Sequence, residues 1–100
     1  MPGRINTYEL SQEADQDLDE IFDYTEAEFG FGQAVTYTNQ FDVIFEKLLD
    51  NPGIGKKRDE IKPGLRSFPK AEHIVFYRIL KDRLRIVRVL HGSRDLPRFF

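Results

Sequence analysis

The last third of the chain is the feature that most constrains its fold. β-Branched, aromatic and arginine residues crowd into three short runs there, Gly64–Pro69, His73–Leu80 and Arg83–Gly92. Such residues favour strands, and Lys81-Asp82 between the second and third runs is a typical hairpin tip. Three successive strands joined by short turns predict an antiparallel sheet at this end of the chain.

Two amphipathic helices are expected before these strands. The first begins after Ser11, a residue suited to cap a helix, and ends near Gly30. The second follows Phe31-Gly32 and stops at Asn51-Pro52, because the residue before a proline disfavours the helical conformation. Helices joined so briefly form an antiparallel hairpin. The positions that recur every three or four residues are Ala14, Leu18, Ile21, Phe22, Thr25 and Phe29, then Ala34, Tyr37, Phe41, Ile44, Phe45 and Leu48.

The remaining segments complete the predicted order β-α-α-β-β-β. Ile5–Leu10 alternates as a first strand, and residues 52–63, with two Gly, two Pro and a charged run, are predicted to be an exposed loop. The predicted class is therefore α+β, with a helical hairpin packed on a small, mainly antiparallel sheet. A length of 100 residues suits one domain spanning residues 1–100.

The composition indicates the cellular compartment in which the chain works. The chain has no cysteine, which suits a reducing compartment, and it shows neither the apolar core of a signal peptide nor a run long enough to span a membrane. We expect a cytoplasmic protein without a membrane partner. The run Asp15–Glu20 lacks the glycine of a calcium loop, and two histidines without cysteine do not make a zinc site, so no metal or other cofactor is expected.

Charge is polarised along the chain. Residues 1–50 hold 12 acids against two bases, a net charge of −10, whereas residues 51–100 hold 13 bases against five acids, a net charge of +8. Two interpretations remain open on this pattern. The acidic helices and the basic sheet can neutralise each other, or one of them can present its charge to a partner.

Both faces of the predicted sheet are apolar. Strand alternation places Ile74, Phe76 and Leu80 opposite Val75, Tyr77 and Ile79, and it groups Leu84, Ile86 and Leu90 opposite Val87 and Val89. One helical hairpin covers one face only. Leaving three or four side chains of the other face in water would forgo roughly 1.5–3 kcal/mol each. Either the tail Leu96–Phe100 folds back as a lid, or a partner covers this face.

This succession resembles the ParE branch of the RelE/ParE toxin superfamily over nearly the whole chain. The sharpest parts are Glu60–Arg66, Phe68-Pro69, His73–Arg78 and Val87–Gly92. The resemblance implies the toxin of a bacterial toxin-antitoxin module that inhibits DNA gyrase by binding. It also implies a ParD-like antitoxin that lies across the sheet in a hetero-oligomer, with DNA reached only through that antitoxin.

Site residues follow from this resemblance as expectations. For the antitoxin, we expect contacts with apolar and basic residues of the last two strands: Ile74, Phe76, Arg78, Leu84, Ile86 and Arg88. For the target, we expect a basic surface formed by Arg66, Arg88, Arg94 and Arg98. A binding toxin needs no catalytic residue, and none is assigned.

An enzyme is the main alternative. RelE-like toxins cleave ribosome-bound mRNA, which requires a base, an acid and cations that stabilise the transition state. Arg66, Arg78, Arg88, His91 and Arg94 could supply such groups, but Ile74 stands where several of these nucleases have a basic residue. A third hypothesis is an inactive toxin that acts only as a corepressor together with its antitoxin.

Overall fold

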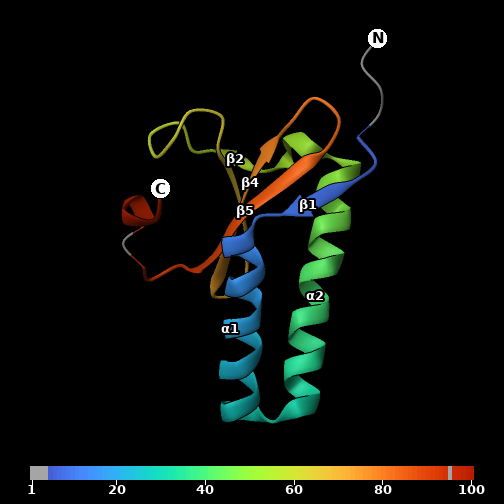
Figure 1. Cartoon of the computed structure of the whole chain (residues 1–100), viewed down its shortest axis with the longest axis vertical. Helices are drawn as coiled ribbons and strands as arrows, with labels where there is room; N and C mark the ends of the chain where they lie inside the picture. The colour runs from blue at the N-terminus through green and yellow to red at the C-terminus, as the bar shows by residue number, and fades with distance from the viewer. Residues whose placement is uncertain (1–4, 95) are drawn as a thin grey trace.

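A helical hairpin packs against a five-stranded sheet (Figure 1). The structure, a computed structural model, describes residues 5–94 and 96–100. Its elements are β1 (Tyr8–Leu10), α1 (Gln12–Phe29), α2 (Phe31–Asp50), the 3₁₀ turn η1 (Pro52–Ile54), β2 (Lys56–Lys57), β3 (Arg66–Lys70), β4 (His73–Ile79), β5 (Leu84–His91) and the 3₁₀ turn η2 (Leu96–Phe99). Among the helices of these residues, none has the length and apolar character needed to cross a membrane.

The two predicted helices are confirmed, and their ends have local causes. The Ser11 hydroxyl accepts a hydrogen bond of 2.9 Å from the Ala14 amide, which caps α1. The same hydroxyl donates to the Val87 carbonyl at 2.7 Å and so ties the start of α1 to β5. Gly30 reverses the chain between the helices with a φ of 93°, a conformation that side chains disfavour. The end of the hairpin near Gly30 extends beyond the sheet (Figure 1).

The sheet has the order β1-β5-β4-β3-β2 and is mixed. β1 pairs with β5 in parallel, and the other neighbours are antiparallel, as expected for most of the sheet. The first strand is shorter than predicted. The segment predicted as a continuous loop contains β2, in which Lys56 pairs with Ser67 and Lys57 with Arg66. Two exposed lysines give no apolar signal, so this edge strand escapes a search for strand patterns.

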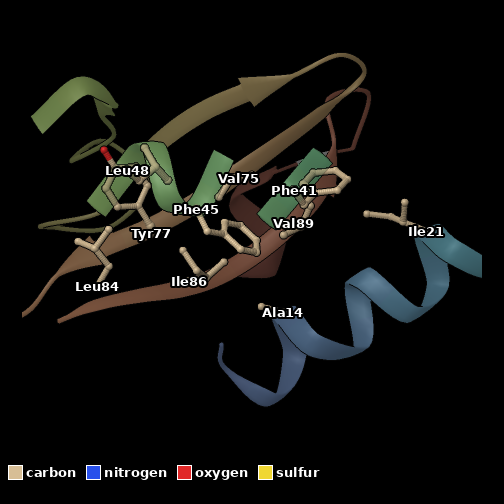
Figure 2. Packing of buried hydrophobic residues seen from close by; sticks show 10 residues of the cluster. All are labelled: Ala14, Ile21, Phe41, Phe45, Leu48, Val75, Tyr77, Leu84, Ile86 and Val89. Atoms are coloured by element: carbon tan, nitrogen blue, oxygen red, sulfur yellow. The ribbon is translucent and has the colours of Figure 1, made fainter. Parts of the chain in front are cut away.

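The main core lies between the hairpin and the sheet (Figure 2). Side chains of α2 meet those of β4 and β5 there, and α1 contributes from one side. Tyr77 is fully buried in this core, and its hydroxyl donates to the Pro52 carbonyl at 2.6 Å and accepts from the Gly55 amide at 2.9 Å. The buried members are Ala14, Ile21, Phe41, Phe45, Leu48, Val75, Tyr77, Leu84, Ile86 and Val89.

A register shift in the β4–β5 pair changes which side chains share a face. Phe76 pairs with Arg88 while Tyr77 pairs with Ile86, so Val87 is an extra residue. Beyond this bulge, Val89 faces the hairpin and Leu90 faces away from it. The expectation that Leu84, Ile86 and Leu90 share one face is therefore wrong, because simple alternation does not hold across a bulge.

The tail of the chain covers the other side of the sheet. The buried residues on this side of the sheet are Leu65, Phe76 and Leu90, and we call them the second face. Leu96, Phe99 and Phe100 pack against it, and the rings of Phe76 and Phe100 lie 4.9 Å apart between centroids. Of the two covers considered from the sequence, the folded chain uses its own tail.

Candidate functional site

The residues expected to bind the antitoxin separate into two groups. Phe76 belongs to the second face, and both Ile74 and the tail pack against the same buried cluster. Arg78 lies near its edge and donates a hydrogen bond of 3.0 Å to the Pro63 carbonyl. Leu84 and Ile86, by contrast, are fully buried between the sheet and the hairpin. The expectation that they contact the antitoxin is corrected, since they sit before the bulge and point toward the helices.

Arg88 is held by an acid of α1. Its Nε and one terminal nitrogen each donate to the Asp17 carboxylate at 2.8 Å, and the Val89 amide donates to the same carboxylate at 2.9 Å. Asp17 is only 7% exposed. The hydrogen bonds to Asp17 raise the pKa of Arg88 above its ordinary value. One acid of the acidic half of the chain and one base of the basic half thus neutralise each other within the fold.

The four arginines expected to meet a target occupy different places. Arg66 donates to the Gly55 carbonyl at 2.9 Å and is held at the loop after α2. The guanidinium carbons of Arg88 and Arg94 lie 5.2 and 5.7 Å from the centre of the Phe99 ring. Arg98 is exposed on η2. Tail contacts therefore bring Arg88 and Arg94 together, whereas Arg66 is positioned by another segment.

A cleft of about 690 Å³ opens between α1, the end of β5 and the tail. We call it the α1 cleft. One wall is formed by residues of α1 and the other by residues at the ends of β4 and β5 and in the tail. Its lining is Glu13, Gln16, Asp17, Glu20, Ile21, Tyr24, Glu72, His73, Arg88, Val89, Leu90, His91, Ser93, Arg94 and Phe99.

Two histidines meet in this cleft because they pair across β4 and β5. Their ring centroids are 5.4 Å apart. The His73 Nδ1 and the Tyr37 hydroxyl are 2.8 Å apart and hydrogen-bonded. The His91 Nδ1 lies 2.7 Å from the Ser93 hydroxyl, and its Nε2 lies 3.6 Å from a Glu72 oxygen. Burial, and then the charge of His91, lower the pKa of His73.

Sequence reasoning weighed only His91 as a group for RNA cleavage, and it missed the pairing of His91 with His73. His73 and His91 stand at the outer ends of adjacent strands, so hairpin register is the signal that could have joined them. It also assigned no inward-facing role to Asp17. Its spacing from Ala14 and Ile21, both on the buried stripe of α1, was the signal that it faces inward.

Comparison with known proteins finds one family and several relatives that match most of this chain. The family described as "ParE toxin of type II toxin-antitoxin system, parDE" matches residues 8–96. The protein named Toxin ParE1 from Caulobacter vibrioides is 37% identical over 91 residues, covering 91% of this chain and 94% of that protein. Toxin ParE1 from Mycobacterium tuberculosis is 37% identical over 92 residues, with the same coverage.

A solved structure agrees with the fold. It is titled as the chromosomal ParDE toxin-antitoxin system from P. aeruginosa, and it matches with a TM-score of 0.76 and 19% identity, over 89% of this chain and 98% of the other. At that identity the match supports the architecture. The family match over most of the chain and the two relatives at 37% identity carry the assignment. This chain belongs to the ParE toxin family of type II toxin-antitoxin systems.

Proposed function

We propose that this ParE toxin acts by binding DNA gyrase and blocking its cycle, and that a ParD-like antitoxin neutralises it in a hetero-oligomer. The family match over residues 8–96 is the observation that carries this proposal. Toxicity by binding requires a complementary surface and not a proton-transfer group. The proposed place of action is the cytoplasm, where gyrase works.

The antitoxin is proposed to bind on the second face. Phe76 and Leu90 are apolar anchors there, with Ile74 beside them, and Arg78 at the edge can meet an acidic group. The tail occupies this face in the folded chain. An antitoxin segment must therefore replace Leu96–Phe100, and neutralisation is a competition between two apolar segments for one surface.

The target surface is proposed to use the basic residues near the tail. Arg94 and Arg98 are exposed. The Arg88 guanidinium is instead bound to Asp17, so Arg88 contributes mainly through its contact with Phe99 of the tail. Exposed cations attract an acidic partner and speed association more than they add affinity. Arg66 would extend this surface only where the partner also reaches the loop after α2.

Cleavage of ribosome-bound mRNA is the second candidate, and the α1 cleft is the reason to keep it. His73, His91 and Arg94 line one cavity there, which is the type of set that acid–base cleavage of RNA requires. Glu13 and Glu20 face the same cavity from α1. Their charges oppose the approach of a phosphodiester, so the cleft fits this chemistry poorly.

The deciding experiment compares two activities of the purified protein. Inhibition of gyrase supercoiling and cleavage of ribosome-bound mRNA are measured for the wild type and for His91→Gln. We expect supercoiling inhibition by both proteins and cleavage by neither. Cleavage that disappears in the variant, with gyrase unaffected, would establish the nuclease. If neither activity appears while the protein strengthens operator binding by its antitoxin, the corepressor hypothesis replaces both.

A further inference from the structure

The α1 wall of the α1 cleft carries a row of polar side chains. Glu13, Gln16, Glu20 and Tyr24 follow one another at spacings of three and four residues, so they project from one side of the helix. Both glutamates are exposed, and Tyr24 is 65% exposed. The helix therefore presents two carboxylates and an aromatic ring to the cavity.

The charges lining the cleft do not balance. Four carboxylates, those of Glu13, Asp17, Glu20 and Glu72, face two arginines. Asp17 and Arg88 neutralise each other, and Glu72 lies beside His91. Within the described parts of the chain, no cation lies within ion-pair distance of Glu13 or Glu20. The α1 wall is thus left with negative charge that a cationic ligand would complement.

The cleft is continuous with the second face. Leu90 belongs to the buried cluster of the second face and also lines the cleft. A segment lying on the second face would therefore pass the mouth of the cleft at Leu90. Glu13, Glu20 and Tyr24 belong to α1, so they keep their places whether or not the tail is displaced.

We infer that the α1 cleft receives an arginine or lysine side chain from the antitoxin segment that binds the second face, an inference that rests on the proposed function. The two glutamates supply carboxylates for the cation, and the Tyr24 ring supplies an aromatic surface. The antitoxin segment then carries a basic residue for the α1 cleft in addition to its apolar anchors. The place of this basic residue relative to the apolar anchors fixes the direction in which the antitoxin segment runs across the toxin.

The first test uses small probes and the free toxin. Acetyl-arginine amide, acetyl-glutamate amide and inorganic phosphate are titrated separately while backbone amide NMR shifts are followed. We expect saturable shifts with the arginine probe at Glu20, Tyr24 and His91, and no saturable shifts there with the other two. Preference for phosphate or for the glutamate probe would overturn the inference, and a phosphate preference would point to nucleic acid.

The matched variants are two double substitutions on the same helix. Glu13→Gln with Glu20→Gln removes the carboxylates of the cleft, and Asp19→Asn with Asp23→Asn removes two exposed acids that do not line it. Both change the net charge equally. We expect the first pair to weaken binding of the arginine probe and of the antitoxin about fivefold, and the second to change each by less than about twofold. Circular dichroism checks that both proteins keep their helices.

The antitoxin measurement separates this inference from the proposed function. Wild-type toxin and both double variants are titrated calorimetrically with the protein encoded by the adjacent reading frame, and each basic residue of that protein is changed to glutamine in turn. We expect one of these antitoxin changes to weaken binding to the wild-type toxin but not to the Glu13→Gln, Glu20→Gln toxin. Equal binding by all three toxins would overturn the α1 cleft assignment while leaving the antitoxin proposal intact. No binding by any would refute the antitoxin proposal, and the small probes would still decide the cleft.

Discussion

Asp17 accepts two hydrogen bonds of 2.8 Å from Arg88 and a third, of 2.9 Å, from the Val89 amide. The carboxylate is nearly buried, and the three donors come from β5. It therefore fastens α1 to the sheet next to the bulge at Val87. This contact lies immediately beneath the α1 cleft, so it also fixes the position of the wall that carries Glu13 and Glu20.

Substitution of Asp17 should be strongly destabilising. Asp17→Asn leaves the Arg88 guanidinium without its counter-charge in a largely enclosed site, and we expect a loss of about 3–5 kcal/mol in the free energy of unfolding. Urea denaturation measures it. Asp19→Asn, on the exposed side of the same helix, is the control and should change stability by less than about 0.5 kcal/mol. Equal effects of the two would show that the pair contributes nothing special.

Gly30 should tolerate no side chain. Its φ of 93° and ψ of 167° lie in a region nearly confined to glycine, so Gly30→Ala is expected to destabilise the protein by about 1–3 kcal/mol. Among the residues that the structure describes, no atom lies within 4 Å of the added carbon, so the backbone conformation is the cause of the expected loss.

Gly32→Ala is the matched control for Gly30. Gly32 lies within α2, and its added carbon also meets no atom of residues 5–94 or 96–100 within 4 Å. Alanine favours a helix over glycine, so this variant should gain up to about 1 kcal/mol. Thermal or urea unfolding of both proteins gives the comparison. A loss at both positions would indicate that the hairpin connection is sensitive to any change.

Loss of the tail should expose the second face and improve antitoxin binding. A chain ending at residue 95 lacks Leu96, Phe99 and Phe100, which pack on Phe76 and Leu90. We expect it to bind the dye ANS more strongly and to melt at a lower temperature. Its affinity for the antitoxin should rise about tenfold, because no competing segment remains.

The control for the tail keeps its apolar residues. Arg98→Ser changes an exposed side chain of η2 and should leave ANS binding and antitoxin affinity close to those of the wild type. If truncation instead weakens the antitoxin complex, the tail is part of that interface and not a competitor for it.

Much of the fold could be predicted because its signals are local. The period of apolar residues in α1 and α2, the Ser11 cap and the Gly30 reversal depend on neighbours in sequence. The faces of β5 could not be predicted. Ile86, Val87, Val89 and Leu90 are all apolar, so nothing local tells which of them is the extra residue. The bulge is set by pairing with β4, and it removed Leu84 and Ile86 from the candidate site.

The candidate site was hidden for the same reason. The α1 cleft joins Glu13 and Glu20 to His73 and His91, which lie more than fifty residues away in sequence. The distances between such residues depend on how α1 packs against the sheet. Charge polarisation left open whether the acids and bases would pair within the fold, and it did not show that Arg88 would pair with Asp17.

Stability should depend on pH through His73. Burial and the charge of His91 lower the pKa of His73 in the folded chain, so the unfolded chain takes up its proton first as pH falls. The contribution of His73 is present above the unfolded value near 6.5 and is lost as pH falls from about 6.5 toward the lower folded pKa. We expect urea midpoints to decline over this window.

Substitution of His73 isolates this contribution. Gln cannot take up a proton, so His73→Gln should flatten the decline between about pH 6.5 and the folded pKa of His73, whatever its effect on stability at pH 8. Acid-induced loss below about pH 4.5 should persist in the variant, since the pKa of Glu9 is lowered by its hydrogen bonds to Arg83 and Arg85. That contribution is present above the ordinary carboxyl pKa and disappears only as pH falls toward the lowered one. An unchanged slope near pH 6 in His73→Gln would assign the titration to another group.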